Sequence, residues 1–135
     1  MYLFDTDILS NLVKKKPSPY LIERLRGIPQ DKQYISSITI GEIVYGAFKS
    51  DQKEKYLIQV KDKLIPLVQL IPFDTNEAFA YGEIRSILEK NGTPLNDTDL
   101  MIAATAVANN LVLITGNESH FSRIENIRVE NWLKK

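Results

Sequence analysis

Short apolar runs alternate with amphipathic stretches along the chain. Tyr2-Leu3-Phe4 is an apolar run that meets polar residues at Asp5, and Ile8 and Leu9 begin a set of apolar residues at helical spacing. This pattern predicts a strand, a turn and a helix. Similar apolar runs predict further strands at residues 34–37, 67–73 and 111–115 and a short edge strand at 127–129.

Helices are predicted between these strands. One ends at Gly27, one begins near Thr39, one over residues 57–65 is stopped by Pro66, one follows a cap at Asp74 and closes at Asn91-Gly92, and one runs from Asp99 to Asn109. Strands alternating with helices are typical of a parallel sheet covered on both faces. We therefore expect one domain over residues 1–135, with a three-layer α/β/α fold and a central parallel sheet of four or five strands.

Composition limits the chemistry that the chain can carry. A length of 135 residues with 44% apolar side chains suits one packed domain. The absence of cysteine excludes disulfides, thiolate zinc sites and a cysteine nucleophile, and a single histidine leaves little room for imidazole metal sites. Carboxylates, amides and water would therefore hold any metal ion, which favours Mg²⁺ or Mn²⁺.

The charge balance excludes a dedicated nucleic-acid coating protein. The 17 basic and 17 acidic side chains give a formal net charge of zero, so any contact with nucleic acid must be local. Lysines gather at residues 14–16 and 134–135, and such runs are usually solvated. No stretch has the length and apolarity of a membrane span, and no signal peptide is recognisable at the start. We expect a cytoplasmic protein with no membrane partner.

Polar residues follow the predicted strands at one edge of the sheet. Asp5 ends the first strand, Glu42 follows the second, Asp99 opens the alanine-rich helix and Asn117 follows the strand at 111–115. Ligands of open parallel sheets bind beyond the carboxyl ends of the strands, where several loops and helix N-termini meet. We therefore expect these four side chains to converge.

Each acid also has a purely structural interpretation. The stretch from Thr39 to Glu42 fits a capping box, and Asp99 suits the positive end of its helix. Asp5, or its neighbours Thr6 and Asp7, would cap the first helix in the same way. Asp74 is interpreted as a cap alone.

Electrostatics separates the two interpretations when the acids are taken together. Three ionised carboxylates within ~5 Å repel by about 1 kcal/mol per pair in water and by more in a cleft. Such a cluster raises its own pKa values unless a cation neutralises it. A divalent ion would remove this conflict and orient water for attack on a phosphodiester.

Four segments resemble a known family. Residues 3–9, 38–46, 99–106 and 113–117 read LFDTDIL, ITIGEIVYG, DLMIAATA and LITGN. They are similar, in order and spacing, to the signature segments of PIN-domain ribonucleases of the VapC toxin type. The resemblance extends from the first residues to Trp132, so it covers nearly the whole chain.

The resemblance implies a toxin-type endoribonuclease that depends on Mg²⁺ or Mn²⁺. Asp5, Glu42 and Asp99 match the acidic positions that hold the metal ion, and the fourth acidic position of the family falls on Asn117. An amide adds no charge there, so we expect one well-held ion before substrate binds. The supporting positions around the ligands are expected at Thr6, Asp97 and Thr115.

The resemblance also implies partners. Proteins of this type are paired with a small VapB-like antitoxin that covers the acidic cleft, they cleave structured RNA such as tRNA or rRNA, and they usually form homodimers. Tyr45 and Phe48 are predicted to be exposed, which suits either the antitoxin or a second subunit. Arg85 is open to two interpretations, a contact with phosphate or carboxylate and an ordinary solvated arginine.

Three other functions are weighed against this one. The Asp5-Thr6-Asp7 order is typical of aspartyl-nucleophile phosphatases, but that chemistry gives Glu42 no role and usually needs a longer chain. The chain lacks the Gly-x-Ser-x-Gly nucleophile motif of a Ser-His-Asp hydrolase, and His120 beside Phe121 is interpreted as loop packing. A PIN-like scaffold that binds without cutting has only Asn117 in its favour.

Overall fold

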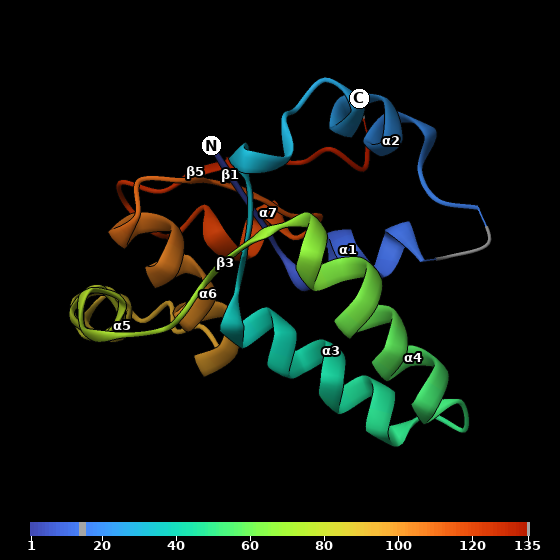
Figure 1. Ribbon diagram of the computed structural model, residues 1–135. Coiled ribbons are helices and arrows are strands. Elements are labelled where there is room, and N and C mark those ends of the chain that lie inside the picture. The colour runs from blue at the N-terminus through green and yellow to red at the C-terminus, as the bar shows by residue number, and fades with distance from the viewer. Residues whose placement is uncertain (14–15, 135) are drawn as a thin grey trace.

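Five parallel strands form the centre of the computed structural model, which describes residues 1–13 and 16–134 (Figure 1). The strands lie in the order β3-β2-β1-β4-β5, and every pair of neighbours is parallel. Their bounds are β1 Tyr2–Phe4, β2 Gln33–Ser36, β3 Gln69–Ile71, β4 Val112–Ile114 and β5 Arg128–Glu130. The earliest strand therefore lies at the middle of the sheet, with β4 beside it from the far end of the chain.

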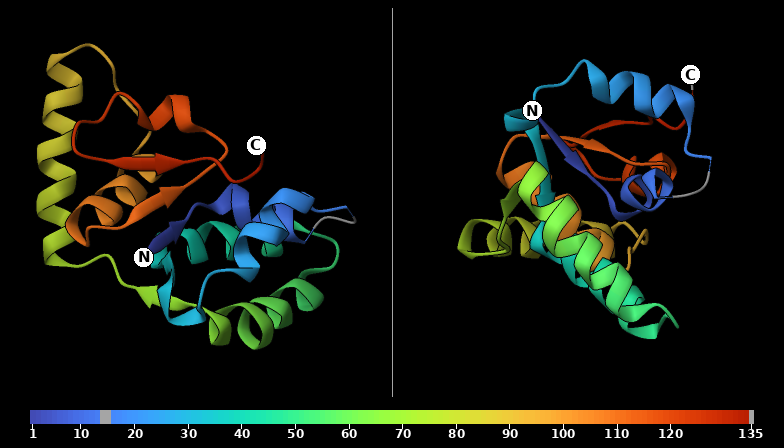
Figure 2. Two further views of the ribbon diagram at one scale, coloured as in Figure 1. Left: turned by 90° about the horizontal axis from the view of Figure 1, so that it is seen from above. Right: turned by 45° about the vertical axis from the view of Figure 1, so that its right-hand side comes forward.

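Helices connect these strands and cover both faces of the sheet. In the described residues they are α1 Thr6–Leu12, α2 Pro19–Arg26, α3 Ser37–Lys49, α4 Lys53–Gln59, α5 Thr75–Lys90, α6 Asp97–Ala108 and α7 Glu118–Phe121, with shorter or wider turns at η1 Gln30–Lys32, η2 Val60–Leu64 and η3 Ile65–Leu67. Figure 2 shows α5 along one side of the molecule and α3 with α4 on the other. None of the helices in the described part of the chain has the length and apolarity needed to cross a membrane.

Alternate strand residues enter two separate cores. Leu3 and Leu113 pack with buried residues of α5 and α6, whereas Phe4 and Ile114 pack with buried residues of α1 and α2. Successive side chains of a strand point to opposite faces, so one apolar run supplies both cores. The fully buried Trp132 closes the second core against Phe4. The predicted three-layer α/β/α fold with a parallel sheet is therefore confirmed.

The predicted cap of α5 is confirmed, whereas the predicted start of α3 is wrong. Asp74 caps α5 as predicted, and Gly92 (φ 70°) adopts the left-handed conformation just after that helix. The helix predicted to start near Thr39 instead starts at Ser37, because the Ser36 side chain accepts a hydrogen bond from the backbone N–H of Ile38. Ser37 is therefore helical rather than part of the strand, and the capping box from Thr39 to Glu42 is wrong.

The remaining differences concern the lengths and ends of elements. The strand predicted over residues 67–73 is confined to β3, and the helix over 57–65 changes from an α-helix to the wider η2 turn before Pro66. The alanine-rich helix begins at Asp97, not at Asp99. Lys14, Lys15 and Lys135 of the two lysine clusters lie outside the described residues.

Candidate active site

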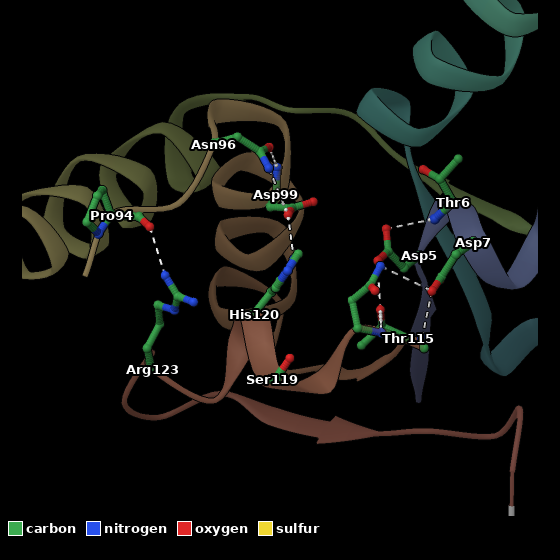
Figure 3. Close-up of polar contacts among 12 residues, drawn as sticks. Asp5, Thr6, Asp7, Pro94, Asn96, Asp99, Thr115, Ser119, His120 and Arg123 are labelled. Carbon is green, nitrogen blue, oxygen red and sulfur yellow. Dashed lines mark hydrogen bonds and ion pairs between the residues drawn. The ribbon is translucent and has the colours of Figure 1, made fainter.

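Asp5 stands at the carboxyl end of the central strand and is held on both oxygens. It is the N-cap of α1, where its Oδ1 accepts a hydrogen bond from the backbone N–H of Thr6 at 2.7 Å. Its Oδ2 accepts one from the hydroxyl of Thr115, at 2.8 Å, just after β4. Only 5% of Asp5 is exposed. The carboxylate is therefore both a helix cap and a fixed charge between two neighbouring strand ends (Figure 3).

Asp7 lies beside Asp5 and is clamped by the loop after β4. Its Oδ2 accepts a hydrogen bond from the backbone N–H of Gly116 at 2.8 Å and lies 3.4 Å from Nδ2 of Asn117. A Cβ atom at Gly116 would lie 2.7 Å from this oxygen, so any larger residue there would have to displace the Asp7 carboxylate. Oδ1 of Asp7 is buried and has no hydrogen-bond partner in the described residues.

Asp99 approaches the same edge of the sheet from the first turn of α6. Its backbone N–H donates to Oδ1 of Asn96, the N-cap, at 2.9 Å, and Nδ2 of Asn96 donates in return to Asp99 Oδ2 at 3.0 Å. Nδ1 of His120 lies 3.5 Å from the same Oδ2. Asp99 points from α6 toward the side on which Asp5 and Asp7 lie (Figure 3).

Burial and two nearby acids raise the free-energy cost of ionising Asp5. Burial raises the pKa of the Asp5 carboxyl to about 6, with the charge of Asp7 adding to the effect and that of Asp99 adding less. The hydrogen bonds from Thr115 and Thr6 offset part of this shift. Burial also raises the pKa of Asp7. A cation between these groups would favour their ionised forms.

Glu42 reaches the site through Thr6. The hydroxyl of Thr6 donates a hydrogen bond to Oε1 of Glu42, while the backbone N–H of Thr6 donates to Asp5. Glu42 is thus connected to the buried Asp5 through one bridging residue, Thr6. Among residues 1–13 and 16–134, no three His, Cys, Asp or Glu side chains form a group that would hold a metal ion by themselves. Of the expected convergence, Thr6 joins Glu42 to Asp5, whereas Asp99 affects Asp5 only as a nearby charge.

The supporting residues predicted around the ligands fall into two sets. Thr6 and Thr115 both contact Asp5, and the backbone N–H of Asn117 donates to the hydroxyl of Thr115 at 3.0 Å. Asp97 instead contacts α5, where it accepts a hydrogen bond from Tyr81 at 2.9 Å and pairs with Arg85 at 3.3 Å. Arg85 contacts carboxylates, as one interpretation expects, but its side chain is 47% exposed, so it is also a solvated surface arginine.

Two residues of this region were not among the predicted site residues. The sequence offers Asp7 only as a helix cap or as the second acid of the phosphatase alternative, although an acid two positions after Asp5 at a strand end is itself a signal. The interpretation of His120 as loop packing is wrong, because His120 lies on α7 with 49% of its side chain exposed and faces Asp99. Phe121, the next residue, is the one that packs in the core.

The donor set fits a hard divalent cation. The acidic side chains near Asp5 offer oxygen ligands, one buried oxygen of Asp7 has no partner among residues 1–13 and 16–134, and Asp5 is costly to ionise without a neighbouring positive charge. Mg²⁺ is commonly bound through one or two carboxylates and keeps several waters, so it needs no complete protein cage. Asp5 and Asp99 are the residues that would hold it.

An apolar groove adjoins the acidic edge. It has a volume of about 540 Å³ and runs between α1, α3 and the α4–η2 segment. Thr6 and Glu42 line it together with apolar side chains that include Leu9, Ile43 and Leu64. Apolar side chains therefore line most of the groove, and its wall also includes the Glu42 carboxylate, which accepts a hydrogen bond from Thr6.

Comparison with known proteins gives consistent results. The PIN domain family model matches residues 2–127. Ribonuclease VapC2 of Rickettsia felis is 35% identical over 99% of both chains, and the tRNA(fMet)-specific endonuclease VapC of Salmonella typhimurium is 37% identical over 97% of both. Among solved structures, DNA-bound VapBC from Salmonella typhimurium matches with a TM-score of 0.90 at 37% identity, covering 97% of each chain. FitAcB from Neisseria gonorrhoeae matches with a TM-score of 0.92 at 26% identity over the full length of both chains.

Proposed function

The chain belongs to the PIN-domain family, among the VapC ribonucleases, and from this premise we propose that it is a toxin-type endoribonuclease that uses Mg²⁺ or Mn²⁺. The observation that carries the proposal is the buried Asp5 carboxylate, whose pKa is raised to about 6 by burial and by the nearby charge of Asp7. A site built to hold unfavourable negative charge at a sheet edge suits a divalent cation. The bound ion would activate water and stabilise the negative charge that develops on the phosphate.

The chain's own residues hold and orient the reacting groups. Thr6 and Thr115 fix both oxygens of Asp5, so this carboxylate keeps one orientation before RNA binds. Asp99 presents its carboxylate from α6, where Asn96 anchors it. Glu42 accepts a hydrogen bond from the hydroxyl of Thr6 and places a further negative charge near the same edge. Asn117 lies exposed at the rim, where its amide would meet substrate or water.

An antitoxin is the expected partner, and the apolar groove supports this. Solved relatives include VapBC complexes from Rickettsia felis and Salmonella typhimurium, in which toxin and antitoxin are bound together on DNA. A VapB-like antitoxin segment with apolar side chains would fill the groove, and an arginine at its end would reach Glu42 and Asp5. We propose that this blocks the metal site.

The substrate and the assembly state are further proposals. We propose that the substrate is a structured RNA, with tRNA favoured over rRNA because the Salmonella typhimurium relative is named a tRNA(fMet)-specific endonuclease. We also propose that the protein acts in the cytoplasm, where tRNA and rRNA are found. We further propose a homodimer, since Tyr45 and Phe48 on α3 are 64% and 59% exposed. Large apolar side chains at the surface often mark an interface.

A cleavage assay tests the proposed function. Purified protein without antitoxin is incubated with cellular tRNA and rRNA in Mg²⁺ or Mn²⁺, with EDTA as the metal-free control. We expect cutting that stops with EDTA and is lost in Asp5→Asn, Glu42→Gln and Asp99→Asn. Asp31→Asn, an exposed acid in η1, is the matched control and should cut as the parent does. Folded variants that cut as fast as the parent would show that the site assignment is wrong.

The phosphatase alternative lacks support from the geometry. Its nucleophile would be Asp5, but both oxygens of Asp5 already accept hydrogen bonds and only 5% of the residue is exposed. Asp7 would be its general acid, yet Asp7 is clamped by Gly116 and has one oxygen fully buried. Failure to form a phosphoenzyme or to bind beryllium fluoride is therefore expected.

A further inference from the structure

The segment after β4 is attached to the start of α6 at two points. Nη1 of Arg123 donates to the carbonyl oxygen of Pro94 at 2.9 Å, and Nδ1 of His120 lies 3.5 Å from Oδ2 of Asp99. Pro94 precedes the N-cap of α6 and Asp99 lies in its first turn, so the two contacts span the beginning of that helix (Figure 3). The short helix α7 is thereby held beside the residue that would bind the metal ion.

Both side-chain contacts of Asp99 fall on the same oxygen. Nδ2 of Asn96 donates to Oδ2 at 3.0 Å, and His120 approaches that oxygen from α7. Oδ1 accepts no hydrogen bond from any residue in 1–13 or 16–134. Two partners on one oxygen restrict rotation of the carboxylate and leave the other oxygen for a ligand. In metal sites, such outer contacts set the orientation of the ligating group.

The His120 side chain contributes little to the packing of the protein. Its side chain is 49% exposed, and the neighbouring Phe121 supplies the core contact of α7. An exposed pair of this kind adds little to folding stability. The contact also needs no charge on the ring, because a neutral imidazole with its proton on Nδ1 donates to a carboxylate.

We propose that His120 is a positioning residue that, together with Asn96, orients Asp99 toward the divalent metal ion. This inference rests on the proposed nuclease function, because it assigns His120 a task only if Asp99 is a metal ligand. His120 acts through Asp99 and does not itself contact the ion. Removing its Nδ1 donor leaves the fold intact but lets the Asp99 carboxylate rotate.

Two variants of nearly equal size separate the polar contact between His120 and Asp99 from side-chain volume. In His120→Asn, the amide nitrogen can stand where Nδ1 stood and still donate to Asp99. In His120→Leu, the donor is lost. We expect His120→Leu to weaken Mn²⁺ binding by about tenfold, the lower end of the effect that outer contacts have on metal affinity. We expect His120→Asn to keep the affinity of the parent.

Isothermal titration of the full chain with Mn²⁺, without RNA, gives the readout. Thermal unfolding of the metal-free variants should match that of the parent, and His120→Leu should lower kcat for RNA cleavage while leaving KM unchanged. Ser119→Ala on the same helix is the control and should behave as the parent in each assay. A loss of affinity restored by asparagine is not expected from a merely structural role.

The outcomes distinguish this inference from the function on which it rests. If the parent binds Mn²⁺ and cleaves RNA but His120→Leu binds Mn²⁺ equally well, the positioning role is overturned and the function stands. The role is also overturned if His120→Asn loses as much affinity as His120→Leu. If the parent neither binds Mn²⁺ nor cleaves RNA, the proposed function and this inference fall together.

Discussion

Asp5 and Asp99 carry the same functional group but are held in different ways. Asp5 is 5% exposed, and its partners are a backbone N–H and the buried Thr115 at the ends of two central strands. The Asp99 side chain is 21% exposed, and its side-chain partners are the surface residues Asn96 and His120. One half of the site is thus built by the core and the other by replaceable surface contacts. Most of the free-energy cost of ionisation therefore falls on Asp5, whereas the orientation of Asp99 depends on exposed residues that can be substituted.

The largest effect is expected from Asp5→Asn. It should lower RNA cleavage by about 10³-fold or more, a loss of about 4 kcal/mol in transition-state stabilisation, because a ligand charge disappears. The same change should stabilise the metal-free chain by about 1–3 kcal/mol, since the raised pKa of Asp5 reports a penalty for its charge. Cleavage kinetics and denaturant unfolding in EDTA measure the two effects. A variant less stable than the parent would show that the core tolerates this charge without strain.

A smaller effect is expected in the pH dependence of stability. The pKa of Asp5 is about 6 in the folded chain against an ordinary 3.8, so the unfolded chain loses this proton first as pH rises. The favourable contribution of the neutral carboxyl is therefore complete below about pH 4 and is lost as pH rises through 6. At most about 3 kcal/mol is involved. The measurement is the free energy of unfolding in EDTA from pH 4 to 7.5, compared with that of Asp5→Asn.

That comparison isolates Asp5 from the other carboxylates. The gap in unfolding free energy between Asp5→Asn and the parent should widen from pH 4 to 6 and then stay constant. Asp99→Asn should produce a weaker trend, since Asp99 is more exposed and only a minor contributor to the Asp5 shift. Equal trends for the two variants would erase the distinction between the two halves of the site.

The smallest effect is expected from Asn96→Ala. It removes the N-cap of α6 and one contact of Asp99, so the chain should lose about 1 kcal/mol of stability. Asn96→Asp keeps a cap for the backbone N–H of Asp99 but places a second negative charge beside its carboxylate. Chemical denaturation should therefore find the aspartate variant closer in stability to the parent than the alanine variant. If alanine costs nothing, surface contacts do not hold this half of the site.

Local sequence predicted the elements and the candidate acids but not how the acids are connected. The strand at residues 2–4, the cap at Asp74 and the exposure of Tyr45 each depend on neighbours in the chain, and the structure confirms them. Sequence alone does not fix the start of α3, because Ser36 and Thr39 are both good cap residues; in the structure Ser36 caps the helix and Thr39 is buried. The metal-binding roles of Asp5, Glu42 and Asp99 remain predictions.

The sequence alone specifies the alternation of strands and helices and puts Asp5 at a strand end and Asp99 in the first turn of a helix. It can do so because apolar periodicity and capping act over a few residues. The tertiary structure alone decided which groups meet. β1 pairs with β4 so that Phe4 lies beside Ile114, and this register brings Thr115 to Asp5 and Gly116 to Asp7 across more than 100 positions. Such contacts depend on the packing of the whole sheet, because the pattern within one strand does not show which strand it will pair with.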